Sequence, residues 1–352
     1  MTGNSPASEV VLEVADLTVG FPSDDGLVQA VRGVSYGVRR GEVLGIVGES
    51  GAGKSVTSLA VMGLLPRSAQ VSGSVRFRGR QLLGAADAEL NTVRGRNISM
   101  IFQDPMTSLN PVYSIGFQVA EAIRAHHSVS KAAARNRAAE LLELVHIPNP
   151  RQRLDSYPHE LSGGMRQRVV IAIAMANDPD VIIADEPTTA LDVTVQAQIM
   201  ESLQTAQQQT GAAMVLITHD LGVIAGQADR VLVMYAGKLV EVGTAEDVFY
   251  TPRMPYTVGL LGSVPQLDRP GTRLISIPGA PPSVLHLPAG CPFAPRCPLV
   301  VARCTEKEPV LEPTTGPEHL AACHRSAALV GAAPGDVFDA SASAVVESGR
   351  DA

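Results

Sequence analysis

The sequence has 352 residues, of which 45% are hydrophobic and 18% charged, so it can bury one large core and add a second, smaller unit. A formal net charge of -7 argues against a surface built to neutralise nucleic-acid phosphates, which requires clustered lysine and arginine. No apolar run approaches the roughly 18 to 20 residues that span a bilayer, and the first residues lack the pattern of a signal peptide. We therefore expect a cytoplasmic chain that does any membrane work through partner proteins.

Short β-branched runs alternate with helical patterns between about residues 10 and 248, which is typical of an α/β fold with a mostly parallel sheet. Residues 43–47, 181–184 and 214–217 are apolar runs that predict buried strands. Residues 114–146 predict two helices, and the second begins after Ser130, a typical N-cap residue. We interpret these helices as a helical subdomain inserted into the α/β core.

A phosphate-binding loop is predicted directly after the first of these strands. Its sequence is Gly48-Glu49-Ser50-Gly51-Ala52-Gly53-Lys54-Ser55, and Val56 continues into a predicted helix. The glycines allow backbone N–H groups to surround phosphate oxygens, and the helix N-terminus adds partial positive charge. Lys54 should reach the β- and γ-phosphates of ATP, and the Ser55 hydroxyl should bind Mg²⁺. A glycine-rich turn with a solvated lysine is the alternative, which the flanking strand and helix disfavour.

An acidic pair, Asp185-Glu186, closes the strand at 181–184, at the end where open α/β sheets bind ligands. We expect Asp185 to hold Mg²⁺ through water, and Glu186 to orient the attacking water or accept its proton as general base. A solvated loop or a helix cap is the alternative for such a pair. His219 follows the strand at 214–217 and is a candidate for contacting the γ-phosphate, although a lone histidine is more often packed or solvated.

A second anion-binding helix start is predicted at Leu161-Ser162-Gly163-Gly164-Met165-Arg166-Gln167-Arg168. Ser162 is a typical N-cap, and the glycines leave the backbone open to an oxyanion. Because the segment has no lysine and no nearby metal ligand, it cannot form a complete nucleotide site. We expect a shared site, in which this segment of one subunit meets the phosphate loop of another with ATP between them. Taken alone, an ordinary serine-capped helix is the simpler interpretation.

These motifs occur in the order typical of ABC-transporter ATPases, which residues 10–250 closely resemble. The matching residues are the phosphate loop, Gln103, Leu161-Ser162-Gly163-Gly164, Asp185-Glu186, Ala190-Leu191-Asp192 and His219. The resemblance implies an α/β P-loop ATPase core with an antiparallel β element near the N-terminus and a helical subdomain. It also implies in-line attack of water on the γ-phosphate, in a dimer that binds two ATP molecules.

The resemblance further implies roles for individual residues. Gln103 would sense Mg²⁺ and the attacking water, and Asp192 would lie at the dimer contact. Phe21 matches the aromatic residue that stacks on adenine, although Phe replaces the commoner Tyr and an aromatic residue near a strand end is usually core. The residues that would contact the ATP of the partner subunit are Ser162, Gly163, Gly164 and Gln167.

The C-terminal region resembles the extension found on the ATPases of oligopeptide and dipeptide importers. The matching segments are Met254-Pro255-Tyr256-Thr257, residues 277–283 and residues 291–298. Met254 departs from the histidine that is more usual there. The resemblance implies an ATP-hydrolysing subunit that powers import of dipeptides, oligopeptides or a related solute such as glutathione, a nickel complex or haem.

The same resemblance implies where the protein works and with what. It implies a second ATP-binding subunit, for which we expect a paralogue rather than a second copy. Two membrane permease subunits and an extracytoplasmic solute-binding protein would complete the transporter, and no nucleic acid is expected. The chain would then lie at the cytoplasmic face of the bacterial cell membrane as a peripheral subunit.

All four cysteines, Cys291, Cys297, Cys304 and Cys323, lie in the C-terminal region. In a reducing compartment such a group indicates metal ligands rather than disulfides. Their spacing does not match the paired knuckles of zinc ribbons, and four thiolates can hold an iron–sulfur cluster, as the resemblance also implies. We expect a 4Fe-4S cluster, with zinc or unligated thiols as alternatives and His324 as the nearest substitute ligand.

We divide the chain into a disordered N-terminus at 1–8, a nucleotide-binding domain at 9–255 with its helical subdomain at about 105–165, a loop-rich metal-binding extension at 256–329 and a disordered tail at 330–352. A soluble ABC-type ATPase for DNA repair or translation is a rival interpretation. Long coiled-coil insertions, a second ATPase core or a basic surface would favour it, and this sequence has none of them. A regulatory module that senses ATP without hydrolysing it would be expected to lack Glu186 or His219.

Overall fold

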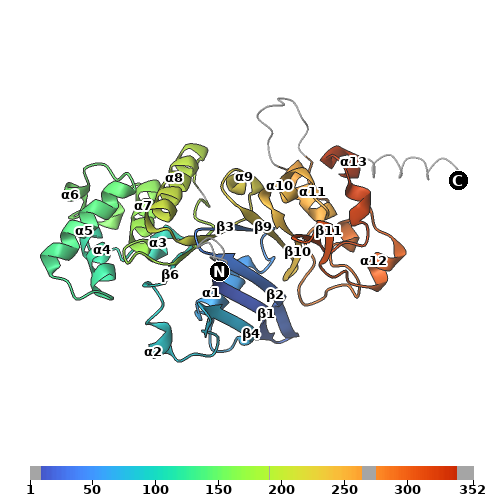
Figure 1. The fold of residues 1–352 in the computed structure, drawn as a ribbon, viewed down its shortest axis with the longest axis horizontal. Coiled ribbons are helices and arrows are strands. Elements are labelled where there is room, and N and C mark those ends of the chain that lie inside the picture. Colours follow the sequence, from blue (N-terminus) through green and yellow to red (C-terminus); the bar gives the residue numbers. More distant parts are fainter. Residues whose placement is uncertain (1–8, 190, 264–274, 339–352) are drawn as a thin grey trace, which may run out of the picture.

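The computed structural model describes residues 9–189, 191–263 and 275–338. Within these ranges the strands form one four-stranded and one eight-stranded sheet. Helices α4 to α6 lie at one end of the long axis, the C-terminal region lies at the other, and the sheets lie between them (Figure 1). The segment 1–8, predicted to be disordered, lies outside the described residues. None of the helices in the described ranges combines the length and apolarity needed to cross a bilayer.

The large sheet has the strand order β11-β12-β10-β9-β3-β8-β7-β6, and the strands from β9 to β6 pair in parallel, as predicted. Such strands are buried on both faces, which explains their continuous apolar runs. Their carboxyl ends open to one edge of the sheet, where ligands bind in folds of this kind. The parallel strands are β3 (Val43–Val47), β6 (Ile98–Ile101), β7 (Val181–Asp185), β8 (Ala213–Thr218) and β9 (Arg230–Tyr235).

The small sheet confirms the predicted antiparallel element near the N-terminus. Its order is β2-β1-β4-β5, and β1 pairs antiparallel with both β2 and β4. Helix α1 (Lys54–Val61) contacts β1 and β2 of this sheet and β7 of the large sheet, so it joins the two. The strands of the small sheet are β1 (Val10–Ser23), β2 (Gly26–Arg39), β4 (Gln70–Phe77) and β5 (Arg80–Gln81).

The two helices predicted within 114–146 are present as α4 and α5. Ser130 is the N-cap of α5, as predicted, because its hydroxyl oxygen accepts the backbone N–H of Ala133 at 3.2 Å. Helix α7 contacts α3, α4, α5 and β6, so it ties these helices to the sheet. The described helices between β5 and β8 are α2 (Asp87–Leu90), α3 (Pro105–Ser108), α4 (Ile115–Arg124), α5 (Lys131–Leu144), α6 (Pro150–Arg153), η2 (Pro158–Glu160), α7 (Gly163–Ala174) and α8 (Val193–Thr210).

The C-terminal region extends the large sheet, whereas the sequence predicted a separate unit. Strand β10 (Lys238–Thr244) pairs with β9 and with β12 (His319–Ala321), which in turn pairs with β11 (Glu312–Gly316). The domain boundary predicted at residue 255 stays a prediction, since the strands on its two sides pair in one sheet. The remaining helices are α9 (Leu221–Ile224), α10 (Ala245–Tyr250), α11 (Pro255–Gly262), η3 (Ala294–Arg296), α12 (Ala302–Glu306), η4 (Ser326–Leu329) and α13 (Pro334–Phe338).

The structure also differs from the predicted disordered tail at 330–352. Helix α13 lies within that segment, and its Val337 and Phe338 are only 3% and 8% exposed. A Cβ atom at Gly259 of α11 would lie 2.8 Å from the Phe338 ring, so the absence of a side chain there lets the ring pack. The apolar partners of this short helix are distant in the sequence, and no local periodicity signals them. Residues 339–352 lie outside the described residues.

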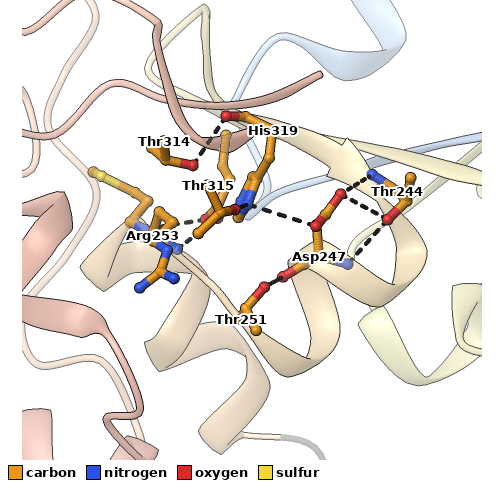
Figure 2. Close-up of polar contacts among 9 residues, drawn as sticks. Thr244, Asp247, Thr251, Arg253, Thr314, Thr315 and His319 are labelled. Atoms are coloured by element: carbon orange, nitrogen blue, oxygen red, sulfur yellow. Dashed lines mark hydrogen bonds and ion pairs between the residues drawn. The ribbon is translucent and has the colours of Figure 1, made fainter. Parts of the chain in front are cut away.

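A buried polar network holds β12 and the segment before α11 to β10. The Glu241 carboxyl group is fully buried and accepts the backbone N–H groups of Arg253 at 2.6 Å and Met254 at 3.1 Å. Nε2 of His319 lies 2.9 Å from Glu241 Oε1. Figure 2 shows the His319 ring directed toward Asp247, whose Oδ1 is 3.8 Å from Nδ1. Because a buried carboxyl group is costly without partners, the C-terminal region depends on these contacts.

We expect His319→Ala to lower the free energy of unfolding by about 3 kcal/mol, because it removes one partner of a buried carboxyl group. Urea denaturation of the full chain measures this change. His286→Ala is the matched control, since His286 is exposed, and it should leave the midpoint close to that of the original chain. Equal midpoints for the two variants would show that the network does not stabilise the fold.

Candidate active site

The loop between β3 and α1 has the backbone shape that phosphate binding requires. Gly53 adopts φ 101° as the N-cap of α1, a conformation that favours glycine. At Gly48, a Cβ atom would lie 2.2 Å from the carbonyl oxygen of Met234, so no side chain fits there. The loop therefore wraps around the N-terminus of α1, whose N–H groups and partial positive charge favour an anion.

Lys54 is 4% exposed and lies beneath this loop. Its Nζ donates to the carbonyl oxygens of Gly48 at 2.7 Å and Glu49 at 3.2 Å, and lies 3.6 Å from Glu186 Oε1. Burial lowers the pKa of the Lys54 ammonium group, and the negative charges of Glu186 and Asp185 oppose that effect. The ammonium group is thus held between the loop and the acidic pair.

Ser55 and Asp185 meet beside the N-terminus of α1. The Ser55 hydroxyl donates to Asp185 Oδ1 at 2.9 Å. Burial raises the pKa of the Asp185 carboxyl group, and the hydrogen bond from Ser55 opposes the rise. Hydroxyl and carboxylate oxygens are ligands that Mg²⁺ prefers, so this pair fits the ion that the sequence predicts there.

Glu186 connects the other polar groups of the site. Its backbone has φ 47°, a left-handed conformation that is uncommon for a residue with a side chain and costs energy. Its Oε2 accepts hydrogen bonds from Gln103 Nε2 at 3.0 Å and Thr189 Oγ1 at 2.9 Å, and lies 3.3 Å from His219 Nδ1. The structure therefore brings Lys54, Gln103 and His219 together around one carboxylate. Thr189 was not predicted, since its only signal is its position three residues after Glu186.

Lys54, Gln103, Glu186 and His219 line a cavity of about 880 Å³, a size suited to a small-molecule ligand. The predicted residues from Glu49 to Val56 form one side, with Gln103, Glu186 and His219 beside them. The C-terminal region supplies another wall, which the sequence did not predict. Its contributing residues are Leu260, Ser263, Ser276, Ile277 and Pro281.

Phe21 and Asp192, both predicted site residues, are absent from the lining of this cavity. Phe21, in β1, is half-buried, packs against the core of the small sheet and does not line the cavity. Asp192 is exposed and caps α8 by accepting the backbone N–H of Val195 at 3.0 Å. Ala190, in the predicted Ala190-Leu191-Asp192 segment, lies outside the described residues.

The predicted second anion-binding segment begins α7 and does not line the cavity either. Ser162 is its N-cap, as predicted, and accepts the backbone N–H of Met165 at 3.3 Å. Ser162 and Gly163 are exposed, whereas Gly164 packs closely on Val195 of α8. Gln167 is 1% exposed, and neither of its amide atoms has a hydrogen-bond partner among the residues that the structure describes. Of the four predicted residues, only Ser162 and Gly163 are therefore exposed to solvent and accessible to a partner.

The four cysteines line one narrow cavity in the C-terminal region. Burial raises the pKa of the Cys297 thiol to about 11 and that of Cys323 to about 12. The predicted metal-binding unit is not supported, because among the described residues no group of three or more His, Cys, Asp or Glu side chains is placed to hold a metal ion. His324, the substitute ligand, instead places Nε2 2.9 Å from the carbonyl oxygen of Lys307.

Three features together define an ATPase of the ABC class. They are a phosphate loop between β3 and α1, an acidic pair at the end of β7, and a second glycine-rich helix start at α7. Comparisons with known proteins agree with this assignment. The family model "ABC transporter" matches residues 31–189, and the model "Oligopeptide/dipeptide transporter, C-terminal region" matches residues 240–304. The chain belongs to the ATP-binding subunits of the oligopeptide and dipeptide ABC transporters.

Individual relatives show how far the similarity extends. The oligopeptide transport ATP-binding protein OppD of Mycobacterium tuberculosis is 58% identical over 331 residues, which cover 93% of this chain and 54% of OppD. This chain thus spans about half the length of that relative. OppD of Salmonella typhimurium is 52% identical over 318 residues, which cover 90% of this chain and 94% of OppD.

A solved structure supports the fold. It is the dimeric, post-hydrolysis state of an ATP-binding cassette bound to ADP and Pi, and it is 27% identical to this chain with a TM-score of 0.60. The match covers 66% of this chain and 98% of the cassette. The α/β ATPase fold predicted from the sequence is therefore confirmed.

Proposed function

We propose that this chain binds and hydrolyses ATP to power the import of peptides through an ABC transporter. The observation that carries the proposal is the convergence of Lys54, Gln103, Glu186 and His219 on one cavity beside the phosphate loop. A module that only senses ATP would not need a carboxylate and a histidine 3.3 Å apart at that place. The names of the relatives support oligopeptides as the class of solute.

In the proposed reaction, Lys54 and the loop N–H groups hold the β- and γ-phosphates of ATP. Ser55 and Asp185 would hold Mg²⁺, which neutralises phosphate charge when it is bound. Glu186 orients a water molecule and accepts its proton, while Gln103 and His219 hold the Glu186 side chain from the other side. The water oxygen bonds to the γ-phosphorus as the bond to the β,γ-bridging oxygen breaks, and ADP leaves with that electron pair.

We infer that a second subunit completes the ATP site. Ser162 and Gly163 present the start of α7 to solvent, and they do not line the cavity of their own chain. A helix start without lysine or metal ligand can stabilise phosphate charge only beside the phosphate loop of another subunit. The similar cassette of known structure is dimeric, which supports such an arrangement. Asp192, exposed at the start of α8, would then lie at the dimer contact.

The partners follow from the same proposal. The second ATPase would be a paralogue, as commonly pairs in peptide importers, and two membrane permeases would dock on the helices near Gln103. An extracytoplasmic solute-binding protein would deliver the peptide. The chain would then lie at the cytoplasmic face of the bacterial membrane as a peripheral subunit, without a nucleic-acid partner.

We also propose that Cys291, Cys297, Cys304 and Cys323 hold a 4Fe-4S cluster. All four thiols line one cavity, which supports a shared ligand. Because a cluster binds its four thiolates through different iron atoms, it does not require three ligands around a single ion, as zinc would. Small loop-rich regions often need such a staple to become ordered.

Replacement of Glu186 tests the proposed reaction. We expect Glu186→Gln to lower ATP turnover by about 10²- to 10⁴-fold while ATP binding remains, because a positioned base contributes about that much. Glu246→Gln is the matched control, since Glu246 is exposed on α10. Phosphate release and equilibrium binding of ATP, measured on the same complex, separate the two steps. Turnover close to that of the control would assign the base elsewhere.

Mass spectrometry of the purified membrane complex tests the proposed partners. Two different ATPase chains should occur in equal amounts with two permease chains, because we expect a paralogue to supply the facing α7 start that each phosphate loop needs. Two copies of this chain would refute the paralogue and keep the shared site. Full ATPase activity of the monomer would refute the shared site itself.

Anaerobic purification of the full chain tests the cluster. The chain has no Trp and 6 Tyr, so its own absorbance is weak and a sulfur-to-iron absorption band should be conspicuous. Iron and sulfide analysis should give four of each per chain, and Cys297→Ser should lower both. Colourless protein with stoichiometric zinc, or with no metal, would rule the cluster out.

A further inference from the structure

An arginine of the C-terminal region reaches into the phosphate loop. Arg296, in η3, donates from Nη1 to Glu49 Oε2 at 2.6 Å and from Nη2 to Glu49 Oε1 at 2.9 Å. Paired hydrogen bonds of this kind between guanidinium and carboxylate are strong and directional. The two residues are 247 positions apart in the sequence, and Arg296 is only 6% exposed. The contact is therefore a partly buried ion pair between the extension and the nucleotide site.

A tyrosine of the same region binds the backbone of the same loop residue. The Tyr256 hydroxyl oxygen accepts the Glu49 backbone N–H at 2.7 Å. Thus Glu49 is held at both its side chain and its backbone, and its N–H is engaged by the extension rather than free to meet a phosphate.

The two contacting residues are themselves fixed by packing. Arg296 Nε donates to the carbonyl oxygen of Pro278 at 3.0 Å, and its guanidinium carbon lies 5.9 Å from the ring centroids of Tyr235 and Phe293. The Tyr256 ring packs on Tyr235 and Phe293 with centroids 4.6 and 5.5 Å away. Side chains held in this way lose little further freedom when they hold the loop.

The position of Glu49 explains why such contacts matter. Glu49 lines the same cavity as Lys54 and Ser55, so it adds a carboxylate close to a site that, by the proposed function, receives the negative charges of a triphosphate. An unpaired carboxylate there would repel the ligand, because like charges repel and a partly buried site screens them less than bulk water does. The Arg296 guanidinium group neutralises the charge of the Glu49 carboxylate by binding both of its oxygens.

We propose that Arg296 and Tyr256 are positioning residues that hold the phosphate loop and neutralise Glu49, so that the C-terminal extension sets the ATP affinity of the site. The inference rests on ATP being the ligand of this cavity, as proposed above. It gives the extension a role in nucleotide binding that does not depend on what the cysteines bind.

Equilibrium binding of ATP to the full chain tests the proposal. Arg296→Met should weaken ATP binding roughly 10- to 100-fold, because it leaves Glu49 charged and unpaired. Adding Glu49→Gln to that variant should restore the affinity to within about 3-fold of the original chain, since the repelling charge is gone. Arg303→Met, at an exposed arginine of the same region, is the control and should bind ATP normally.

The rescue distinguishes neutralisation from a merely structural role. If Arg296 only keeps the extension folded, Glu49→Gln will not restore binding, and that result would overturn the proposal. Unchanged affinity in Arg296→Met would overturn it as well. Failure of the original chain to bind ATP would instead refute the proposed function on which the inference rests.

Tyr256→Phe provides a second test of the proposal, which is needed if the Arg296→Met variant does not fold. It removes a single hydroxyl group and keeps the ring that packs on Tyr235 and Phe293, so the fold should survive. ATP affinity should fall about 3- to 10-fold, the worth of about one hydrogen bond to the loop. Hydrogen exchange at the Glu49 amide should also become faster. Unchanged affinity with unchanged exchange would show that the hydroxyl does not hold the loop.

Discussion

The parallel pairing of β3, β8 and β7 is the constraint on which the rest of the site depends. In this register Val47 of β3 lies beside Thr218 of β8, and Asp185 of β7 lies beside Ile217. The phosphate loop, His219 and the acidic pair therefore leave the sheet at nearly the same level. The backbone N–H of Glu186 donates to the Ile217 carbonyl oxygen at 2.9 Å, which extends the pairing by one residue. Ser55 and Asp185, which are 130 positions apart in the sequence, thus meet at one edge of the sheet.

Lys54, Asp185 and Glu186 are buried together, and this lowers the free-energy cost that burial of each charge would carry alone. An isolated buried charge is costly, and a neighbour of opposite sign recovers part of that cost. The carboxylates oppose the effect of burial on the pKa of Lys54, and Lys54 opposes the effect of burial on the pKa of Asp185. Two hydrogen bonds of Lys54 go to loop carbonyl oxygens, so an incoming phosphate replaces neutral partners with charged ones.

The sequence predicted the parts of the site that depend on neighbouring residues. The strand, the glycines and the helix around Lys54 are contiguous, and each acidic or histidine candidate follows its strand directly. Contacts between distant segments have no such signal. Arg296 was visible only as part of the cysteine-bearing segment, and nothing in that segment indicates Glu49 as its partner. Strand β12 has three residues and was missed because its pairing with β10 is decided by Glu241 and His319, which are 78 positions apart.

The geometry around Glu186 suggests how its two oxygens divide their roles in the proposed reaction. Gln103, Thr189 and His219 all surround Oε2, whereas the one contact that Oε1 makes within the described part of the chain is the longer one of 3.6 Å with Lys54. An oxygen that already accepts two hydrogen bonds has little capacity for another donor. Oε1 is thus the oxygen available to a water molecule, and it lies on the side of Lys54, where the γ-phosphate is expected. The left-handed backbone at Glu186 costs energy, as is common at functional sites, and the contacts to Oε2 hold the side chain in one orientation. The proposed base would therefore be oriented before a nucleotide binds, which is what efficient proton transfer requires.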